Sequence, residues 1–124
     1  MKTTEIKNLE FVENKRENIL IAPLDKSEHY DVVLAVVKPR ETLSPHKHLR
    51  PDNGDEIFLF YKGGEFEVRT DTSSKTFRTQ NPIMVRFRSL EPHSIINLAD
   101  SELRFFAFYV PPFDPEEVKA VSLR

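Results

Sequence analysis

Hydrophobic and polar residues alternate along much of this chain, most clearly between Gly64 and Arg69. There Phe66 and Val68 alternate with charged residues, which is the pattern of a β-strand with one buried and one solvated face. Further short runs rich in β-branched or aromatic residues occupy 18–22, 30–37, 56–61, 83–88, 93–98 and 103–110. The pattern predicts a succession of short strands at close intervals.

Turn-forming residues separate these runs. They include Pro39, Pro45, the stretch 51–54, Gly63-Gly64, the stretch 71–74, Asn81-Pro82 and Pro92. Proline restricts backbone angles and glycine frees them, so these positions predict turns or breaks in strands. The middle of the chain lacks the repeated helical segments that a parallel βαβ sheet needs. The sequence therefore predicts an all-β fold, either an antiparallel barrel or a jelly roll.

The C-terminus is the one segment with helix signals. Asp114 can cap a helix, Pro115 suits the first helical position, and two glutamates follow. Negative charge near a helix N-terminus is stabilising, since the backbone N–H groups there are unpaired. These features predict a short C-terminal helix.

Composition narrows the classes of function. The chain has 124 residues, enough for one core but too few for two ordinary domains. Its formal net charge is −2, so it lacks the positive excess that binds nucleic acids or anionic membranes, and we expect neither as a partner. It contains no cysteine, which excludes disulfides, thiolate catalysis and sulfur-based metal sites. No apolar run approaches the ~20 residues of a membrane-spanning helix and the start lacks a signal-peptide core, so we expect a cytoplasmic protein.

Three of the four histidines form a pattern with one glutamate. His46 and His48 are two residues apart, so on a strand both imidazoles project from the same face and can converge on one ion. Glu56 opens an aromatic strand, where a carboxylate needs a partner because burial of an unpaired charge is costly. His93 opens another apolar strand. Alternatively, His46 and His48 are loop residues after Pro45. Glu56 is then an ordinary solvated strand start, and His93 is a hydrogen-bonded histidine at a sheet edge.

The order and spacing of these residues resemble the two motifs of the cupin superfamily. The matching positions are His46, His48, Glu56 and Gly63 of the first motif, and His93 and Asn97 of the second. The resemblance covers about residues 33–113. It implies a double-stranded β-helix, that is, a jelly-roll barrel, which we expect as a single cupin domain over 1–124 with a barrel core of about 18–113. Homodimers are plausible from the family and from the apolar run 103–110.

The chain departs from the family pattern at several positions. Arg40 and Pro82 stand where the motifs begin with glycine, and Arg88-Ser89-Leu90 replaces the usual Pro-x-Gly. The segment between His48 and Glu56 is also longer than usual, which leaves Asp52 and Asp55 as rival carboxylate ligands. We favour Glu56, because it alone has the family spacing to Gly63.

The resemblance implies one divalent metal ion per chain. Its ligands would be His46, His48, Glu56 and His93. Imidazole nitrogens and one carboxylate suit Fe, Mn, Ni, Zn or Cu, and the ligand set does not choose among them. The expected function is a metal-dependent enzyme of the dioxygenase or isomerase/lyase type that acts on a small polar, oxygen-rich metabolite. The alternative is a non-catalytic binding module for a sugar or sugar acid.

Other candidates are interpreted as structural. Asn97 either orients a metal ligand or, as we favour, ends a strand by bonding local backbone. Arg86 and Arg88 are expected on an outer face by strand parity. The segment 50–53 is expected to be an exposed turn, although it could close over the barrel mouth. His29 is expected at the surface.

Overall fold

A computed structural model describes residues 1–123, and nearly all of its secondary-structure elements are antiparallel strands. The strands are β1 (Val12–Asn14), β2 (Ile19–Lys26), β3 (Asp31–Val37), β4 (Thr42–His48), β5 (Asp55–Lys62), β6 (Glu65–Thr70), β7 (Ser74–Arg78), β8 (Ile83–Phe87), β9 (His93–Asn97), β10 (Leu103–Val110) and β11 (Val118–Ala120). Two 3₁₀ turns, η1 (Pro51–Asn53) and η2 (Pro115–Glu117), complete the described elements. The predicted all-β fold is confirmed.

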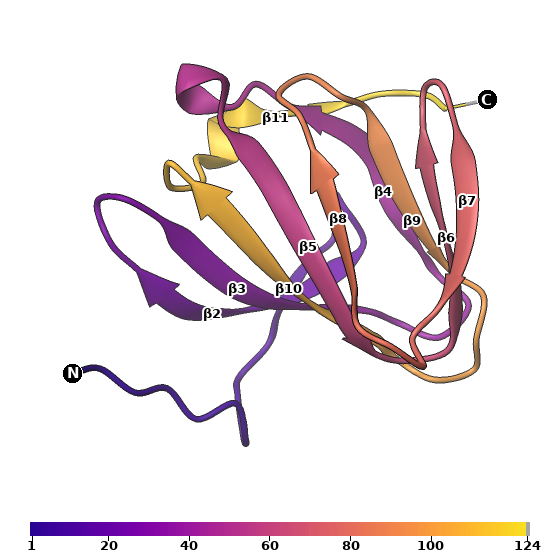
Figure 1. Cartoon of the computed structure of the whole chain (residues 1–124), viewed down its shortest axis with the longest axis horizontal. Coiled ribbons are helices and arrows are strands. Elements are labelled where there is room, and N and C mark those ends of the chain that lie inside the picture. The colour runs from indigo at the N-terminus through magenta and orange to yellow at the C-terminus, as the bar shows by residue number, and fades with distance from the viewer. Residues whose placement is uncertain (124) are drawn as a thin grey trace.

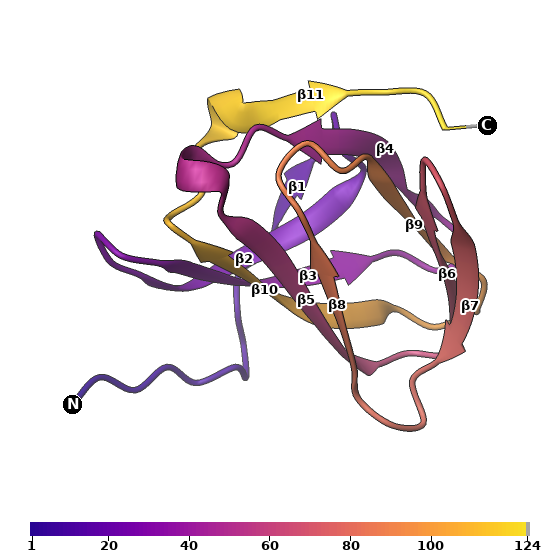
Figure 2. The same ribbon diagram turned by 45° about the horizontal axis from the view of Figure 1, so that its top comes forward.

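The strands form two sheets that face each other. One sheet has the order β1-β2-β3-β10-β5-β8, and the other has the order β11-β4-β9-β6-β7 (Figures 1 and 2). Neighbours such as β3 and β10 are far apart in sequence but fully paired, from Val37 opposite Leu103 to Asp31 opposite Tyr109. This arrangement is a jelly roll, in which the inner faces of both sheets enclose one core.

Strand alternation places the core. Along β10, Phe105 and Ala107 are buried, whereas Phe106 and Phe108 are only half-buried on the outer face. The apolar run 103–110 therefore places apolar residues on both faces of one strand. Phe60 of β5 packs on Phe66 of β6 with ring centroids 4.4 Å apart, which joins the two sheets across the core.

The predicted C-terminal helix is wrong. Asp114 does cap the first turn, since its side chain accepts a hydrogen bond from the backbone N–H of Glu116, but η2 has only three residues. The chain then extends at Val118, which is buried and lies opposite His48 of β4. Pairing with the free edge of β4 satisfies the backbone groups, so tertiary contact overrides the local helix signal.

Pro45 lies inside a strand and not in a turn. The pairing of β4 with β9 shifts register between Leu43 and His46, which marks an irregularity at the proline. Proline cannot donate to a ladder and is tolerated at such bulges. The strand resumes beyond it, so His46 and His48 both lie on β4. Within residues 1–123 no helix is long and apolar enough to cross a membrane.

Candidate metal centre

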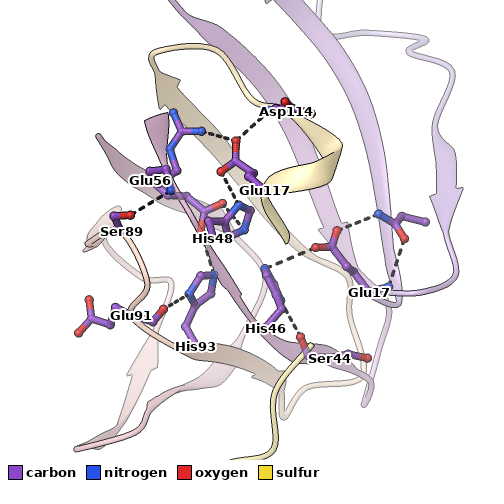
Figure 3. Close-up of polar contacts among 12 residues, drawn as sticks. Glu17, Ser44, His46, His48, Glu56, Ser89, Glu91, His93, Asp114 and Glu117 are labelled. Carbon is purple, nitrogen blue, oxygen red and sulfur yellow. Dashed lines mark hydrogen bonds and ion pairs between the residues drawn. The ribbon is translucent and has the colours of Figure 1, made fainter. Parts of the chain in front are cut away.

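The four candidate ligands converge at one place inside the fold. Two adjacent strands of one sheet, β4 and β9, carry His46, His48 and His93, and β5 of the other sheet carries Glu56. His46 and His93 lie directly opposite each other in the ladder. One nitrogen or oxygen atom from each of the four residues lies within 4.8 Å of the others, and all four side chains are buried (Figure 3). The structure therefore brings together the residues that the sequence singled out.

The rival carboxylates do not join this cluster. Asp52 lies in the exposed turn η1. Asp55 is half-buried, and its carboxylate lies 3.8 Å from the Arg86 guanidinium, on the outer face of the sheet. Strand parity explains this difference, because Asp55 and Glu56 are adjacent on β5 and point to opposite faces. Among the two aspartates and Glu56, only Glu56 faces the histidines.

Each imidazole is oriented by a hydrogen bond from its Nδ1 atom. The acceptors are Ser44 O for His46 (2.7 Å), Glu91 O for His93 (3.0 Å) and Glu117 Oε2 for His48 (2.9 Å). Carbonyl and carboxylate oxygens only accept, so Nδ1 is the protonated nitrogen in each ring. The Nε2 atoms therefore carry lone pairs in the neutral rings, which is the state that binds metal ions.

The inner atoms of the cluster have no hydrogen-bond partner. His93 Nε2 lies 2.9 Å from Glu56 Oε1, and His48 Nε2 lies 3.2 Å from Glu56 Oε2, but neither contact has hydrogen-bond geometry. Unpartnered lone pairs this close to a carboxylate repel one another unless a cation lies among them. Three neutral nitrogens and one carboxylate are a donor set that first-row divalent metals favour. The residues present fit such an ion.

Electrostatics within the cluster favour the metal-binding forms of Glu56 and His46, but they favour the protonated form of His93. Burial opposes ionisation of Glu56, but the His93 and His48 imidazoles outweigh it and lower the pKa of this carboxyl to about 2. Burial, reinforced by His93, lowers the pKa of His46 to about 4, so this ring is neutral near pH 7. Burial also opposes protonation of His93, yet the Glu56 carboxylate raises the pKa of His93 overall. In the metal-free protein, a proton therefore competes with a metal ion for the His93 imidazole.

A buried polar network supports His48 from behind. Glu117 accepts from His48 through Oε2 and from Arg50 Nη1 through Oε1, at 2.6 Å. The Arg50 guanidinium also donates to Pro111 O and lies 5.3 Å from the centre of the Tyr109 ring. The expected exposed turn is therefore wrong for Arg50, whose side chain is fully buried, although Asp52 is exposed.

Sequence reasoning missed this network. Glu117 lies 69 positions from His48 and 67 from Arg50, so no local spacing signals their contact. The reason they meet is the pairing of β11 with β4, which follows directly after Glu117.

The other candidate residues have the structural or surface positions that the sequence analysis expects. Asn97 Nδ2 donates to backbone carbonyls of Val37, Lys38 and Ser101, and Ala99 N donates to its Oδ1. Asn97 therefore ties loops together at the end of β9. The side chains of Arg86, Arg88 and His29 are exposed, as expected.

A cavity of about 250 Å³ opens beside the cluster. His46 and His48 lie in its wall, together with Glu17, which follows β1 and which the sequence did not suggest. Glu17 Oε2 accepts from Asn14 Nδ2 at 2.8 Å, whereas Oε1 has no hydrogen-bond partner and lies 3.6 Å from His46 Nε2 (Figure 3). Burial, with the nearby Glu56 carboxylate, raises the pKa of Glu17 to about 7. An uncompensated carboxyl group thus faces the cavity next to a candidate ligand.

Neither family models nor curated proteins match this sequence. Solved structures do match. KdgF from Halomonas sp. is 14% identical and superimposes with a TM-score of 0.77 over 94% of this chain and 98% of that one. The cupin domain of Cnp3 from Schizosaccharomyces pombe is 13% identical, with a TM-score of 0.68 over 86% and 72% of the two chains. Oxalate decarboxylase from Lactobacillus farciminis is 17% identical, with a TM-score of 0.71 over 94% of this chain and 35% of that one.

These likenesses cover nearly the whole chain at low identity, so they concern the fold and not the activity. They agree with the two antiparallel sheets of this chain. We conclude that this chain has the fold of the cupin superfamily.

Proposed function

We propose that this protein is a metal-dependent enzyme that binds one divalent transition-metal ion per chain. Its ligands would be His46, His48, Glu56 and His93. The observation that carries the proposal is the set of buried, unpartnered nitrogen and oxygen atoms that converge on one point. Leaving such atoms without a partner costs stability, so a fold that assembles them needs an ion to offset that cost.

The adjacent cavity would hold the substrate. A bound divalent ion supplies Lewis acidity, which polarises an oxygen of the substrate. The surrounding chain would contribute orientation and exclusion of water, because Phe58, Phe105 and Phe113 line the cavity. Oxygenation and isomerase or lyase chemistry both use such a site. The likeness to oxalate decarboxylase, by its name an enzyme of a small oxygen-rich molecule, supports a small substrate bound through oxygen.

Metal analysis tests this proposal. The purified wild-type protein should bind close to one equivalent of Zn²⁺ or another first-row divalent ion, measured by elemental analysis after dialysis against the metal. The His93→Ala variant should lose most of this metal while its far-ultraviolet circular dichroism remains that of a β-protein. His29→Ala is the matched control, because His29 is exposed and is not one of the four clustered residues. Full occupancy in His93→Ala, or no binding by the wild type, would refute the site.

The second candidate is a non-catalytic binding module, and the cavity beside the cluster is the observation that supports it. A ligand that raises the melting temperature equally with and without chelator would favour this function. A shift that disappears with the metal would favour the enzyme.

A further inference from the structure

Three neighbouring strands of one sheet present a continuous apolar surface to the cavity beside the cluster. In the ladders that join β2, β3 and β10, Ile21 lies opposite Ala35, and Val33 lies opposite Ala107. Residues that are paired across adjacent strands share a face of the sheet, so this surface continues from one strand to the next. We call it the apolar wall, and its members, all of which line the cavity, are Ile21, Pro23, Val33, Ala35, Phe105 and Ala107.

The apolar wall and two candidate metal ligands border the same cavity. His46 and His48 line it from β4 of the other sheet, so an ion held by the cluster lies next to the space that the wall bounds. The cavity measures about 250 Å³. Because an apolar cavity of about 150 Å³ holds a benzene molecule, this one has room for a group of phenyl size together with a small polar head.

Most of the polar residues that line the cavity pair with one another. Asn14 Nδ2 donates to Glu17 Oε2 at 2.8 Å, and Lys26 Nζ lies 3.7 Å from the Asp31 carboxylate, where β2 ends and β3 begins. The other carboxyl oxygen of Glu17 lies beside His46, at the metal end of the cavity. A ligand hydroxyl placed against the apolar wall would therefore give up water without gaining a hydrogen bond from these side chains. A hydrocarbon surface has no such cost there and is stabilised by burial.

We propose that this site takes a ligand of two parts, an oxygen head that binds the ion and an apolar body of about phenyl size that packs against the apolar wall. A divalent metal ion accepts both neutral and anionic oxygen donors, so the selection lies in the body and not in the charge of the head. This inference rests on the proposed function, because the head uses the same metal site. It narrows the expected polar metabolite to one that is polar at one end.

Calorimetric titration of the Zn²⁺-loaded protein with two matched probes tests the selection. Acetohydroxamate and benzohydroxamate share one metal-binding head and differ in the body, which is a methyl group in the first and a phenyl group in the second. The affinity of each probe for free Zn²⁺ is measured in the same buffer, so that a difference between the heads can be divided out. Zinc content is measured after each titration to exclude stripping of the ion.

We expect benzohydroxamate to bind at least about tenfold more tightly than acetohydroxamate, because the phenyl group buries more apolar surface. A corrected ratio near one would overturn the inference. Tighter binding of acetohydroxamate, or no binding of either probe to the zinc-loaded protein, would overturn it as well.

Val33→Thr tests the apolar wall itself. The substitution replaces a methyl group by a hydroxyl group of similar size, so it changes the polarity of the wall more than its shape. The preference for benzohydroxamate should shrink by about fivefold, since the ring would cover the hydroxyl group. Val32→Thr is the matched control, because Val32 is the neighbouring residue of β3 and lies opposite Phe108, on the outer face of the sheet. Equal preferences in the two variants would overturn the placement of the body against this wall.

The two proposals fail in different ways. If the wild type binds no zinc, the metal site itself is wrong. If it binds one equivalent but does not prefer benzohydroxamate, the metal site stands and the inferred ligand class is wrong.

Discussion

At the scale of single residues, Glu117 connects the C-terminal segment to a candidate metal ligand. Its two oxygens accept from His48 and from Arg50, and its Oε1 also accepts from Asp114 N at 2.8 Å. A carboxylate behind a metal-binding imidazole fixes the ring and makes its other nitrogen a stronger ligand. Glu117 therefore has a positioning role toward the metal centre through His48.

We expect Glu117→Gln to weaken Zn²⁺ binding by about 10–100-fold. The amide presents N–H groups on one side, so it faces a donor at either His48 or Arg50 and loses one of the two contacts. Competition with a chromophoric chelator measures the affinity. Glu116→Gln is the control, since Glu116 is exposed beside it. Equal affinities in the two variants would show that His48 does not depend on Glu117.

At the scale of elements, β8 shows how one strand serves both the core and the site. Its residues alternate, so Met84 is 70% exposed while Phe87 is 1% exposed. Phe87 stacks on the His93 ring with centroids 4.0 Å apart and contacts Phe58 edge-on. The last residue of β8 thus braces a ligand that β9 carries.

Phe87→Ala should lower the free energy of unfolding by about 3–5 kcal/mol, because it opens a cavity in the core. It should also weaken metal binding, since the His93 ring loses its stacking partner. Met84→Ala on the same strand should change stability by less than about 0.5 kcal/mol. Urea denaturation followed by circular dichroism measures the free energy of unfolding of both variants. A Phe87→Ala variant as stable as Met84→Ala would contradict the assigned core.

At the scale of the whole molecule, folding itself assembles the candidate metal centre. The histidines come from one sheet and Glu56 from the other, so the four side chains meet only when the sheets pack together. An ion bound by all four would therefore bind the folded state in preference to the unfolded chain.

Homodimerisation stays a prediction. The half-buried Phe106 and Phe108, on the outer face of β10, are the first candidates for a contact between subunits.

We expect Zn²⁺ at about 100 times its dissociation constant to add about 2.7 kcal/mol of stability, which raises the melting temperature by about 10 °C for a chain of this size. Differential scanning calorimetry measures the shift, and excess chelator should reverse it. His93→Ala should show little or none of it. A shift of the same size in His93→Ala would mean that zinc stabilises the protein from another site.

The sequence by itself determined most of the strands and the four residues that form the cluster. Alternation is a local property of each strand, and it predicted strands that include β5, β6 and β9. The spacing of His46, His48 and Glu56 is also local, so it could be compared with a family pattern. Edge strands such as β7 and β11 were missed, because short polar segments carry a weak alternation signal and gain stability from the neighbouring strand.

Only the tertiary structure decided what surrounds the cluster. It turned the expected C-terminal helix into β11, buried Arg50 and brought Glu117 behind His48. It also placed Glu17 in the wall of the cavity, beside His46. These contacts join segments that are distant in sequence, and no local periodicity encodes them. A polar group that is buried when the sheets pack is stabilised by a hydrogen-bond partner, and the partners of Arg50 and His48 come from a distant segment of the chain.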